Sequence, residues 1–301
     1  DKPRHNAYII RVGDDAYIQQ KERQMQLLTE TENLFISQGA INRKRLRAAA
    51  ARAVVSTDHT YIFSPPGLGK TYTIEDEFNK QNANWVPIKG NTSLWGFITD
   101  IAMIVANKDD DDIIVFIDDC DTLLTQTDSI NTMKIALNDG VLEYKKALGA
   151  QYAMLEEDQQ IAIDKFRQEG RTGVSIPLDG IKFIWASNYK LADQQDSANA
   201  KSDRQVQRCM HEEALRRRMR TLDYDVTGDI KWGWIADCVL NETPPSMVNA
   251  QRVELEQIVA WMHSNWAALK EHNISIAEKL YDEMVQDPDG YLTIWELDYL
   301  I

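Results

Sequence analysis

Ser64-Pro65-Pro66-Gly67-Leu68-Gly69-Lys70-Thr71 is the stretch that decides the fold of this chain. The apolar run Tyr61–Phe63 precedes it, and a helix-like run begins at Tyr72. A strand, a glycine-rich loop and a helix in this order are typical of a phosphate-binding loop. The glycines allow turns that point several N–H groups into one concavity, and the helix N-terminus adds its positive dipole end. The simpler alternative is a surface turn that contains Gly-Lys-Thr by chance.

Each part of this loop has an expected role. We expect the backbone from Pro66 to Tyr72 to surround the phosphates of a nucleoside triphosphate, with Lys70 reaching the β- and γ-phosphates. The Thr71 hydroxyl can ligate Mg²⁺. The leading glycine of the motif is replaced by Ser64, and the two prolines that follow stiffen the loop.

Apolar runs suited to buried parallel strands alternate with helical stretches over residues 56–226. The runs are Tyr61–Phe63, Trp85–Ile88, Ile113–Ile117, Ile181–Ala186 and the weaker Thr221–Tyr224. The helical stretches between them are residues 72–80, 93–106, 128–148 and 204–219. This alternation predicts an α/β domain, a three-layer sandwich with a parallel five-stranded sheet that binds ligands at the carboxyl ends of its strands.

The remainder of the chain has a mainly helical pattern. In an N-terminal segment, residues 1–55, we expect two helices, at residues 16–36 and 42–54. In a small all-helical domain, residues 227–301, we expect helices at about residues 230–240, 246–270 and 274–286. The excursion between Tyr144 and Gly180 is longer than a simple crossover needs, and it predicts a helix at residues 151–169 and a loop at residues 170–180.

The composition is that of a soluble globular protein, with 44% hydrophobic and 27% charged residues. No apolar run reaches membrane-spanning length, so we expect no membrane partner. The three cysteines are widely spaced, which favours reduced thiols and a cytoplasmic location. The net charge of −14 opposes broad, nonspecific binding to DNA or to anionic membranes.

That charge is unevenly distributed. Residues 1–55 hold ten Lys and Arg against six Asp and Glu, so this segment is +4 and the remainder is −18. The basic residues that cluster before the first strand are Arg43, Lys44, Arg45, Arg47 and Arg52. They fit two interpretations. The first is a surface patch that binds nucleic acid or a partner. The second is a helix face that is exposed to solvent or docked on an acidic neighbouring subunit. The absence of interleaved aromatic residues favours the second interpretation.

A second motif follows the strand Ile113–Ile117, which ends in the paired carboxylates Asp118-Asp119. In a nucleotide site the first carboxylate can hold Mg²⁺ through water, and the second can orient and activate the attacking water. The carboxyl end of this strand should lie beside the phosphate loop. The alternative is a polar strand terminus. Cys120 and Asp121 continue the turn, and we expect Asp121 to cap the helix that follows.

Together these motifs resemble those of the AAA+ ATPases. Pro65–Thr71 is similar to the first nucleotide motif of the family, and Asp118-Asp119 to the second, which usually reads Asp-Glu. Asp119 is one methylene shorter than glutamate, which implies slow hydrolysis or a shifted geometry. The run Asp118–Asp121 is also similar to uncharacterised AAA+ proteins of phage genomes. The resemblance implies ATP and Mg²⁺ as cofactors.

Two more family motifs follow in the expected order. Phe183–Asn188 resembles the sensor 1 strand, where the Asn188 amide would hydrogen-bond the γ-phosphate and the attacking water; a turn-forming asparagine is the alternative. Ala214–Met219 resembles the segment that carries the arginine finger, with Arg218 the best match by spacing and Arg217 next. The alternative for these arginines is salt bridges to the acidic body of the protein.

The helical tail is similar to the lid domain of the family in position and class, and the resemblance implies a sensor 2 arginine there. Arg252 is one candidate. Ile274-Ser275-Ile276-Ala277 also resembles a sensor 2 setting, but it has Ala277 where the arginine would stand.

Two further segments admit a functional and a plain interpretation. Trp95 lies in a triplet similar to the pore loop of AAA+ unfoldases, or it anchors a helix in the core. Residues Asp287–Glu296 resemble the later part of a calcium-binding EF-hand loop, but Val285 stands where the first ligand should be, so a helix-terminating turn is favoured.

Two functions are consistent with these motifs. The first is an ATP-hydrolysing motor or switch that works as a ring, expected to be a hexamer, and remodels or loads a protein or a DNA-bound complex. Asp119 would polarise water, Asn188 would sense the γ-phosphate, and Arg218 would act on the nucleotide of the neighbouring subunit. The alternative is a nucleotide-gated assembly or recruitment module with little or no turnover, which the shorter Asp119 motivates.

Overall fold

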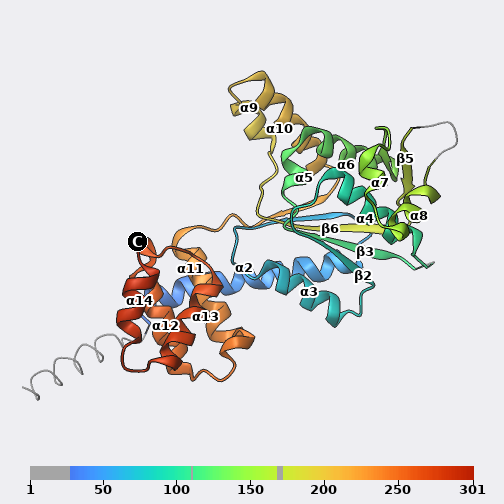
Figure 1. Ribbon diagram of the computed structural model, residues 1–301. Coiled ribbons are helices and arrows are strands. Elements are labelled where there is room, and N and C mark those ends of the chain that lie inside the picture. Colours follow the sequence, from blue (N-terminus) through green and yellow to red (C-terminus); the bar gives the residue numbers. More distant parts are fainter. Residues whose placement is uncertain (1–27, 110, 168–171) are drawn as a thin grey trace, which may run out of the picture. The chain divides into compact units, whose positions relative to one another are not determined.

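The computed structural model describes residues 28–109, 111–167 and 172–301 (Figure 1). The chain forms two compact units. The sheet unit comprises residues 46–65 and 70–225, and the helical unit comprises the described residues up to Arg45 together with residues 66–69 and 226–301. Among the described residues, no helix combines the length and the apolar character needed to cross a membrane.

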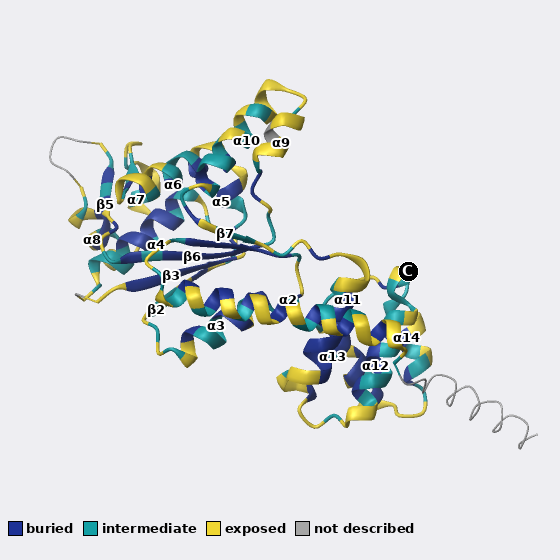
Figure 2. Ribbon diagram, turned by 180° about the vertical axis from the view of Figure 1, so that it is seen from behind, coloured by how far each residue is buried: buried dark blue, intermediate teal, exposed yellow. Residues whose placement is uncertain are grey.

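The sheet unit is built on five parallel strands in the order β2-β3-β6-β1-β7. Their bounds are Thr60–Phe63 (β1), Trp85–Lys89 (β2), Ile113–Asp118 (β3), Ile181–Ser187 (β6) and Arg220–Asp223 (β7). The five apolar runs therefore form the five predicted strands, within a residue or two at each end. The three central strands are buried along almost their whole length, as expected of a parallel sheet that is covered on both faces (Figure 2).

Helices cover both faces of this sheet, which confirms the predicted sandwich. Val115 and Phe183 are register partners on one face, where the Phe183 ring lies 6.3 Å from that of Phe97 in α4 (Leu94–Ala106). Phe116 points to the other face, where its ring meets that of Phe78 in α3 (Lys70–Lys80) at 5.4 Å. Figure 2 shows α3 on one side of the sheet and α4 and α6 (Thr127–Asp139) on the other.

The excursion before β6 differs from its prediction. Helix α6 ends at Asp139, and Gly140 takes a left-handed conformation (φ 68°), so the predicted helix over residues 128–148 is too long. The chain then forms a two-stranded antiparallel sheet of β4 (Val141–Tyr144) and β5 (Val174–Pro177). Between them lie two short helices, α7 (Ala150–Ala153) and α8 (Glu157–Lys165), in place of the single predicted helix. The remaining elements of the sheet unit are α5 (Thr122–Thr125), α9 (Gln194–Asn199) and α10 (Asp203–Arg216).

A single helix, α2 (Glu30–Val55), replaces the two helices predicted before the first strand. Residues 16–27 of that prediction lie outside the described residues. The helix continues through Gly39, where a Cβ would lie 2.3 Å from the carbonyl carbon of Gly233. Gly39 is therefore required for close packing against α11 (Gly228–Asp237), and it does not interrupt the helix.

The C-terminal region is all-helical, as predicted, with a shorter second helix than expected. After α11 its elements are η1 (Cys238–Glu242), η2 (Pro245–Met247), α12 (Arg252–Ser264), η3 (Trp266–Ala268), α13 (Ile274–Gln286) and α14 (Tyr291–Tyr299). Aromatic rings fill its interior: Trp261 packs edge-on against Trp295 at 5.1 Å, and Trp232 stacks on His263 at 4.3 Å.

Candidate nucleotide-binding site

The site is set up by three neighbouring strands whose carboxyl ends lie together. β6 pairs with β1 on one side and with β3 on the other, with Phe63 opposite Ser187 and Asp118 opposite Ala186. The loops continue this contact: Ser64 N–H donates to the Ser187 carbonyl, and Asp119 N–H donates to the Ala186 carbonyl, both at 3.3 Å. The glycine-rich loop, the paired carboxylates and Asn188 therefore start from adjacent positions.

The glycine-rich loop has the backbone geometry that the sequence predicts. Gly67 and Gly69 both have positive φ values, 79° and 70°, which a side chain would disfavour. Gly67 also has no room for one, because a Cβ there would lie 2.1 Å from the Cβ of Asn273, within the helical unit. Ile274 N–H donates to the Gly67 carbonyl at 3.1 Å. Helix α3 starts directly after this loop, at Lys70.

Lys70 is buried, with 6% of its surface exposed, and it is held by two oxygen atoms. Its Nζ donates to the Ser64 carbonyl at 3.1 Å and to Asn188 Oδ1 at 2.8 Å. Burial lowers the pKa of Lys70, and the nearby carboxylates of Asp119 and Asp118 oppose that shift. Ser64, the residue that replaces the motif glycine, is fully buried. Its backbone carbonyl accepts from Lys70 and so helps to hold the ammonium group in place.

Thr71 and Asp118 form a compact set of oxygen atoms. Thr71 Oγ1 lies 3.0 Å and 2.9 Å from the two carboxylate oxygens of Asp118. Asp118 is 5% exposed, and this burial raises its pKa even though the Thr71 hydrogen bond acts in the opposite direction. A hydroxyl beside a carboxylate is the kind of donor set that Mg²⁺ prefers, so these two residues fit the predicted metal site.

Asp119 and Asn188 are joined directly. Asn188 Nδ2 donates to Asp119 Oδ1 at 2.9 Å, while its Oδ1 accepts from Lys70. Asp119 is exposed and has a φ of 54°, a left-handed conformation that is uncommon for a residue other than glycine. Asn188 thus connects the buried ammonium group with the exposed carboxylate, and a turn-forming role alone does not explain these two bonds.

The structure therefore brings together Lys70, Thr71, Asp118, Asp119 and Asn188 in the sheet unit. Of the other predicted loop residues, Leu68 is buried and Pro66 is exposed. Tyr72 is 57% exposed, so its ring is available to a ligand.

Arg218 is not part of this set, and strand β7 explains why. β7 runs parallel to β1, with Arg220 opposite Thr60 and Asp223 opposite Phe63. Arg218 precedes β7, so it lies beyond the amino end of that strand, and the strand alone spans about 10 Å from Arg220 to Asp223 at a rise of about 3.3 Å per residue. No hydrogen bond or ion pair within the described part of the chain joins Arg218 to the five residues above.

The three consecutive arginines Arg216, Arg217 and Arg218 differ in their partners. Arg216 pairs with Asp223 at 2.6 Å, and Arg217 pairs with Glu213 on its own helix. Arg218 Nη1 donates to the carbonyl of Ala214, and its Nε is buried without a hydrogen-bond partner among the described residues. Arg218 is thus the residue of the Arg216–Arg218 run that forms no ion pair among the described residues, whereas salt bridges account for its two neighbours.

The sensor 2 candidates lie in the helical unit. Arg252 is engaged there, because its Nη1 donates to the Leu240 carbonyl at 2.5 Å and its Nε pairs with Glu256 at 2.8 Å. The start of α13 instead contacts the glycine-rich loop through Asn273 and Ile274. Sequence reasoning identified Ile274–Ala277 as a sensor 2 setting but missed Asn273, whose cap position before the helix was the available signal.

A buried polar network under Asn188 was also missed. Ser187 Oγ donates to Asp121 Oδ1, and Tyr61 OH donates to the carbonyl of Tyr189. Asp121 stands at the N-cap position of α5, where the sequence predicts it, but its side chain makes no cap bond and accepts from Ser187 instead. Because Ser187 and Tyr61 are fully buried, these bonds fix the chain on both sides of Asn188.

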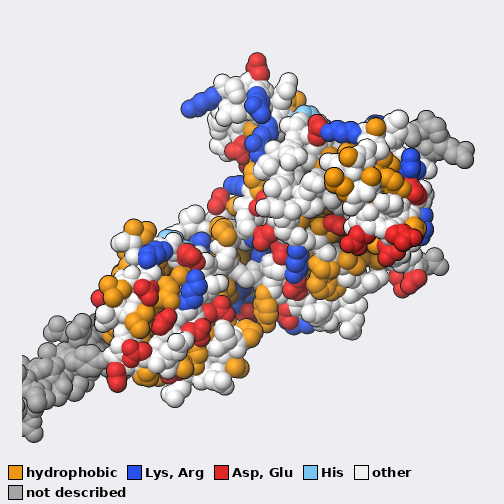
Figure 3. Space-filling model, in the orientation of Figure 1, with side chains coloured by type: hydrophobic (Ala, Val, Ile, Leu, Met, Phe, Trp, Pro, Cys, Tyr) orange, Lys and Arg blue, Asp and Glu red, His pale blue; other side chains and the backbone are white. Residues whose placement is uncertain are grey.

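The basic cluster before β1 is divided between internal partners and solvent. Arg43 lies in the helical unit between Asp237 at 2.7 Å and Glu242 at 2.6 Å, and Arg47 pairs with Asp76 at 2.7 Å in the sheet unit. These two arginines are therefore not free to form a binding patch. Elsewhere on the sheet unit, basic and acidic side chains lie side by side over α9 and α10 (Figure 3).

Trp95 and residues 287–296 have structural roles. Trp95 is 9% exposed and packs on Tyr144 at 5.1 Å, which places it in the core and not at a surface that could grip a substrate. Asp287 ends α13, and its carboxylate accepts the Gly290 N–H at 3.0 Å, as in a helix-terminating turn. No cluster of metal-ligating side chains is found within the described ranges.

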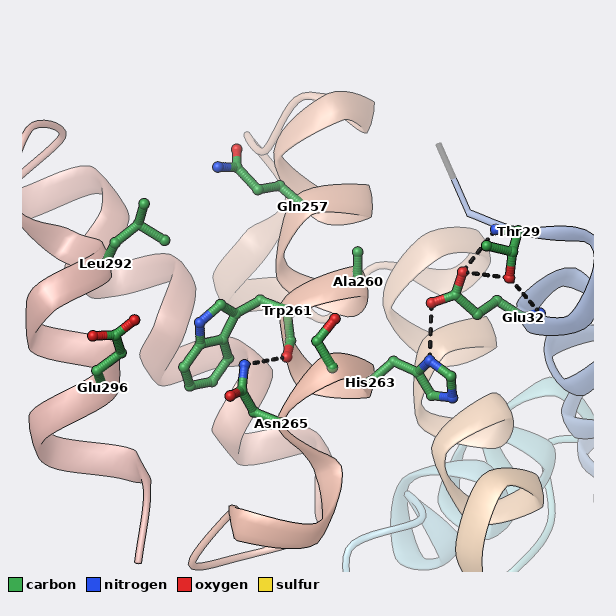
Figure 4. Close-up of a pocket in the computed structure, with 10 residues that line it drawn as sticks. Thr29, Glu32, Gln257, Ala260, Trp261, His263, Asn265, Leu292 and Glu296 are labelled. Carbon is green, nitrogen blue, oxygen red and sulfur yellow. Dashed lines mark hydrogen bonds and ion pairs between the residues drawn. The ribbon is translucent and has the colours of Figure 1, made fainter. Parts of the chain in front are cut away.

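The helical unit contains a separate cavity of about 420 Å³ (Figure 4). Its polar wall is already paired, because Glu32 accepts from Thr29 and bonds to His263 at 2.9 Å. On the far side Leu292 and Glu296 project from α14, with Trp261 between the two walls. The polar groups of this cavity do not converge on one point, in contrast to those of the sheet unit.

Comparison with known protein families finds no match, and no curated protein matches. Among solved structures, the chain is similar to Thermotoga maritima RuvB, described as a Holliday junction branch migration motor, with 16% sequence identity and a TM-score of 0.41. That match covers 87% of this chain and 64% of the RuvB chain. Two single-residue variants of RuvB match at 16% identity with TM-scores of 0.43 and 0.44, over 68% and 66% of their length. Such a likeness concerns the backbone fold and supports no conclusion about activity.

Proposed function

We propose that this chain is an ATPase of the AAA+ type that binds and hydrolyses ATP with Mg²⁺. The observation that carries the proposal is the hydrogen-bonded set Lys70, Thr71, Asp118, Asp119 and Asn188 at the carboxyl ends of adjacent parallel strands. Ligands of open α/β sheets bind at this edge. Each member has a chemical type that phosphoryl transfer needs: a cation, oxygen ligands for a metal, a base and an amide.

The residues present fit ATP and Mg²⁺. The start of α3 offers backbone N–H groups to phosphate oxygens, and Lys70 offers its ammonium group. Thr71 and Asp118 would hold Mg²⁺, which neutralises charge on the phosphates when bound. Burial of Asp118 disfavours its charged form, and a cation bound there would stabilise that form.

Asp119 and Asn188 would act on the attacking water. The exposed Asp119 carboxylate would accept a proton from water, and the Asn188 amide would hold Asp119 in its left-handed backbone conformation. Asn188 also accepts a hydrogen bond from Lys70. One amide group would therefore hold the Asp119 carboxylate and the Lys70 ammonium group at a fixed separation.

We also propose that the protein works as a ring, a hexamer in the AAA+ pattern. Arg218 lies towards the amino ends of the strands and forms no ion pair among the described residues, so it is unsuited to its own site and would act on the nucleotide of a neighbouring subunit. In this proposal residues 1–55 are an N-terminal segment, residues 56–226 the nucleotide-binding domain and residues 227–301 the lid. The substrate would be a protein or a DNA-associated protein, and the location cytoplasmic.

Steady-state ATP hydrolysis with and without Mg²⁺ tests the enzymatic part of this proposal. We expect Mg²⁺-dependent turnover that is abolished in Asp119→Asn and Arg218→Ala, while both variants still bind ATP. The Asp119→Asn variant keeps the size of the side chain and removes only the base. Turnover that survives in Asp119→Asn would contradict the role of that carboxylate.

A second function, a nucleotide-gated assembly module, is favoured by one observation. The Asp119 carboxylate is short and already accepts a hydrogen bond from Asn188, which reduces its capacity to act as a base. Sedimentation with and without ATP, read beside the hydrolysis assay, separates the two functions. ATP-dependent assembly without turnover, at any protein concentration and with or without DNA, supports the module and refutes the ATPase.

A further inference from the structure

Tyr189 follows Asn188 directly, and its side chain leaves the phosphate site for helix α10. Its hydroxyl donates to Glu212 Oε1 at 2.6 Å and accepts from Arg208 Nη2 at 2.7 Å. The Arg208 guanidinium carbon lies 5.5 Å from the centre of the Tyr189 ring. Tyr189 therefore makes one charge-assisted bond to an acid and another to a base, both on the same helix.

Glu212 is the centre of this contact. It is 2% exposed, and it accepts hydrogen bonds from three donors: Tyr189 OH, Arg208 Nε at 2.8 Å and Ala192 N–H at 3.0 Å. A buried carboxylate with fully matched donors is rigid, since the loss of any donor leaves a charge without compensation. Burial and the adjacent Glu212 raise the pKa of Tyr189 to about 12, so its hydroxyl stays a donor at neutral pH.

A second bond ties the same loop to the same helix. Arg216 Nη1 donates to the carbonyl of Leu191 at 3.3 Å, near the end of α10. The segment from Tyr189 to Ala192 is thus attached to α10 at two points, Glu212 and Arg216. Arg218 lies two residues after the end of α10, and it is bonded to that end, because its N–H donates to the Leu215 carbonyl at 3.0 Å and its Nη1 donates to the Ala214 carbonyl.

We infer that Tyr189 is a positioning residue that makes the Asn188 turn and helix α10 move as one body, so that the nucleotide bound at Asn188 sets the position of Arg218. This inference rests on the proposed function, and it adds a route by which one site reports its nucleotide state to the next. The main chain of Tyr189 is bonded to Tyr61 OH and Ser187 Oγ, so the Asn188 turn and the Tyr189 ring belong to one hydrogen-bonded segment. In this inference, the Asn188 turn and helix α10 together form the element that takes one position for each nucleotide state.

Tyr189→Phe is the perturbation, because it removes both side-chain hydrogen bonds and keeps the ring. The readout is hydrogen–deuterium exchange over residues 203–216, measured in the whole protein with Mg²⁺ plus either ADP or a non-hydrolysable ATP analogue. In the wild type we expect exchange in α10 to differ by about tenfold between the two nucleotides, within the range typical of coupled sites. In Tyr189→Phe we expect the two nucleotides to give the same exchange. A merely structural role would instead shift exchange equally with both.

Tyr152→Phe is the matched control, because Tyr152 OH also donates to a carboxylate, Asp164 at 2.7 Å, away from α10. We expect this control to behave as the wild type. Glu212→Gln keeps an acceptor for Tyr189, and we expect it to retain part of the difference between nucleotides. In turnover, Tyr189→Phe should lower kcat about tenfold with nucleotide affinity within about twofold.

The outcomes separate the inference from the function on which it rests. A wild type that binds no ATP refutes the proposed function. A wild type that binds ATP but shows the same α10 exchange with both nucleotides overturns the inference and leaves the ATPase intact. An exchange difference that persists in Tyr189→Phe overturns it as well.

Discussion

Replacement of Asn188 by alanine is the sharpest test of how the site works, because this amide makes two bonds that serve different groups. It accepts from Lys70 Nζ at 2.8 Å and donates to Asp119 Oδ1 at 2.9 Å. A hydrogen bond to a charged group contributes about 1.5–3 kcal/mol. Asn188 is only partly buried, so we take the lower end for each bond, about 3 kcal/mol in total. At about 1.4 kcal/mol per tenfold change, this corresponds to a loss of about 100-fold in kcat.

Nucleotide affinity should change much less than kcat. The glycine-rich loop and the start of α3 are untouched, and Lys70 keeps its second partner, the Ser64 carbonyl at 3.1 Å. We expect the Kd for an ATP analogue to stay within about threefold. The assay is steady-state hydrolysis beside fluorescence titration of the analogue. Asn131→Ala is the matched control, because Asn131 also accepts from a lysine, Lys134 at 3.0 Å, but on α6.

Two results would refute this reasoning. If kcat of Asn188→Ala stays within about threefold of the wild type, the amide takes no part in the chemical step. If Kd rises as much as kcat falls, Asn188 contributes to nucleotide binding as well as to the chemical step, which contradicts the expected small change in affinity. A thermal melt of each variant shows whether lost activity reflects lost folding.

Three further predictions concern the metal site, the shared site and the packing of α2. Burial raises the pKa of Asp118, so its charged form opposes folding at neutral pH, and this effect is relieved as pH falls through the raised pKa. Asp118→Asn should therefore melt at a higher temperature than the wild type at pH 7, and this difference should disappear as the pH is lowered towards the ordinary aspartate pKa. The variant should also lose Mg²⁺-dependent turnover. An unchanged melting temperature at pH 7 contradicts the burial argument. Arg218→Ala should abolish turnover yet regain it in mixtures with Lys70→Ala subunits, which supply the arginine; mixtures as inactive as either variant alone would argue against a shared site. Gly39→Ala should lower the free energy of unfolding by about 3 kcal/mol or more, because its Cβ would lie 2.3 Å from backbone atoms, whereas the exposed Ser37→Ala on the same helix should have little effect; equal denaturant midpoints would exclude the close packing.

The sequence predicts most of the sheet unit, because its strands are buried on both faces and leave long apolar runs. The run ending at Asp118 and that ending at Ser187 both become central strands. The adjacency of Lys70, Asp118 and Asn188 follows from parallel strands that end at one edge. At these strand ends, the apolar pattern of the sequence and the strand arrangement of the fold lead to the same placement of the side chains.

The misses have specific physical causes. Helix α6 was predicted too long because β4 follows its left-handed Gly140 without a break in apolar pattern. Helix α2 was divided because sequence alone cannot show that Gly39 meets Gly233 across a helix contact. The Tyr189–Glu212 hydrogen bond joins residues 23 positions apart in the sequence. No sequence pattern links the two positions, so only the folded structure shows that they lie together.

Calorimetric titration of the protein with ATP in the presence of Mg²⁺ tests the central claim most directly. We expect the wild type to bind one nucleotide per chain, and Lys70→Ala to lose affinity by about 100-fold because the buried ammonium is removed from the phosphates. Lys146→Ala is the control, because 66% of the Lys146 side chain is exposed. We expect this variant to bind ATP as the wild type does. No binding by the wild type, or equal binding by Lys70→Ala, would contradict a nucleotide site at the end of β1.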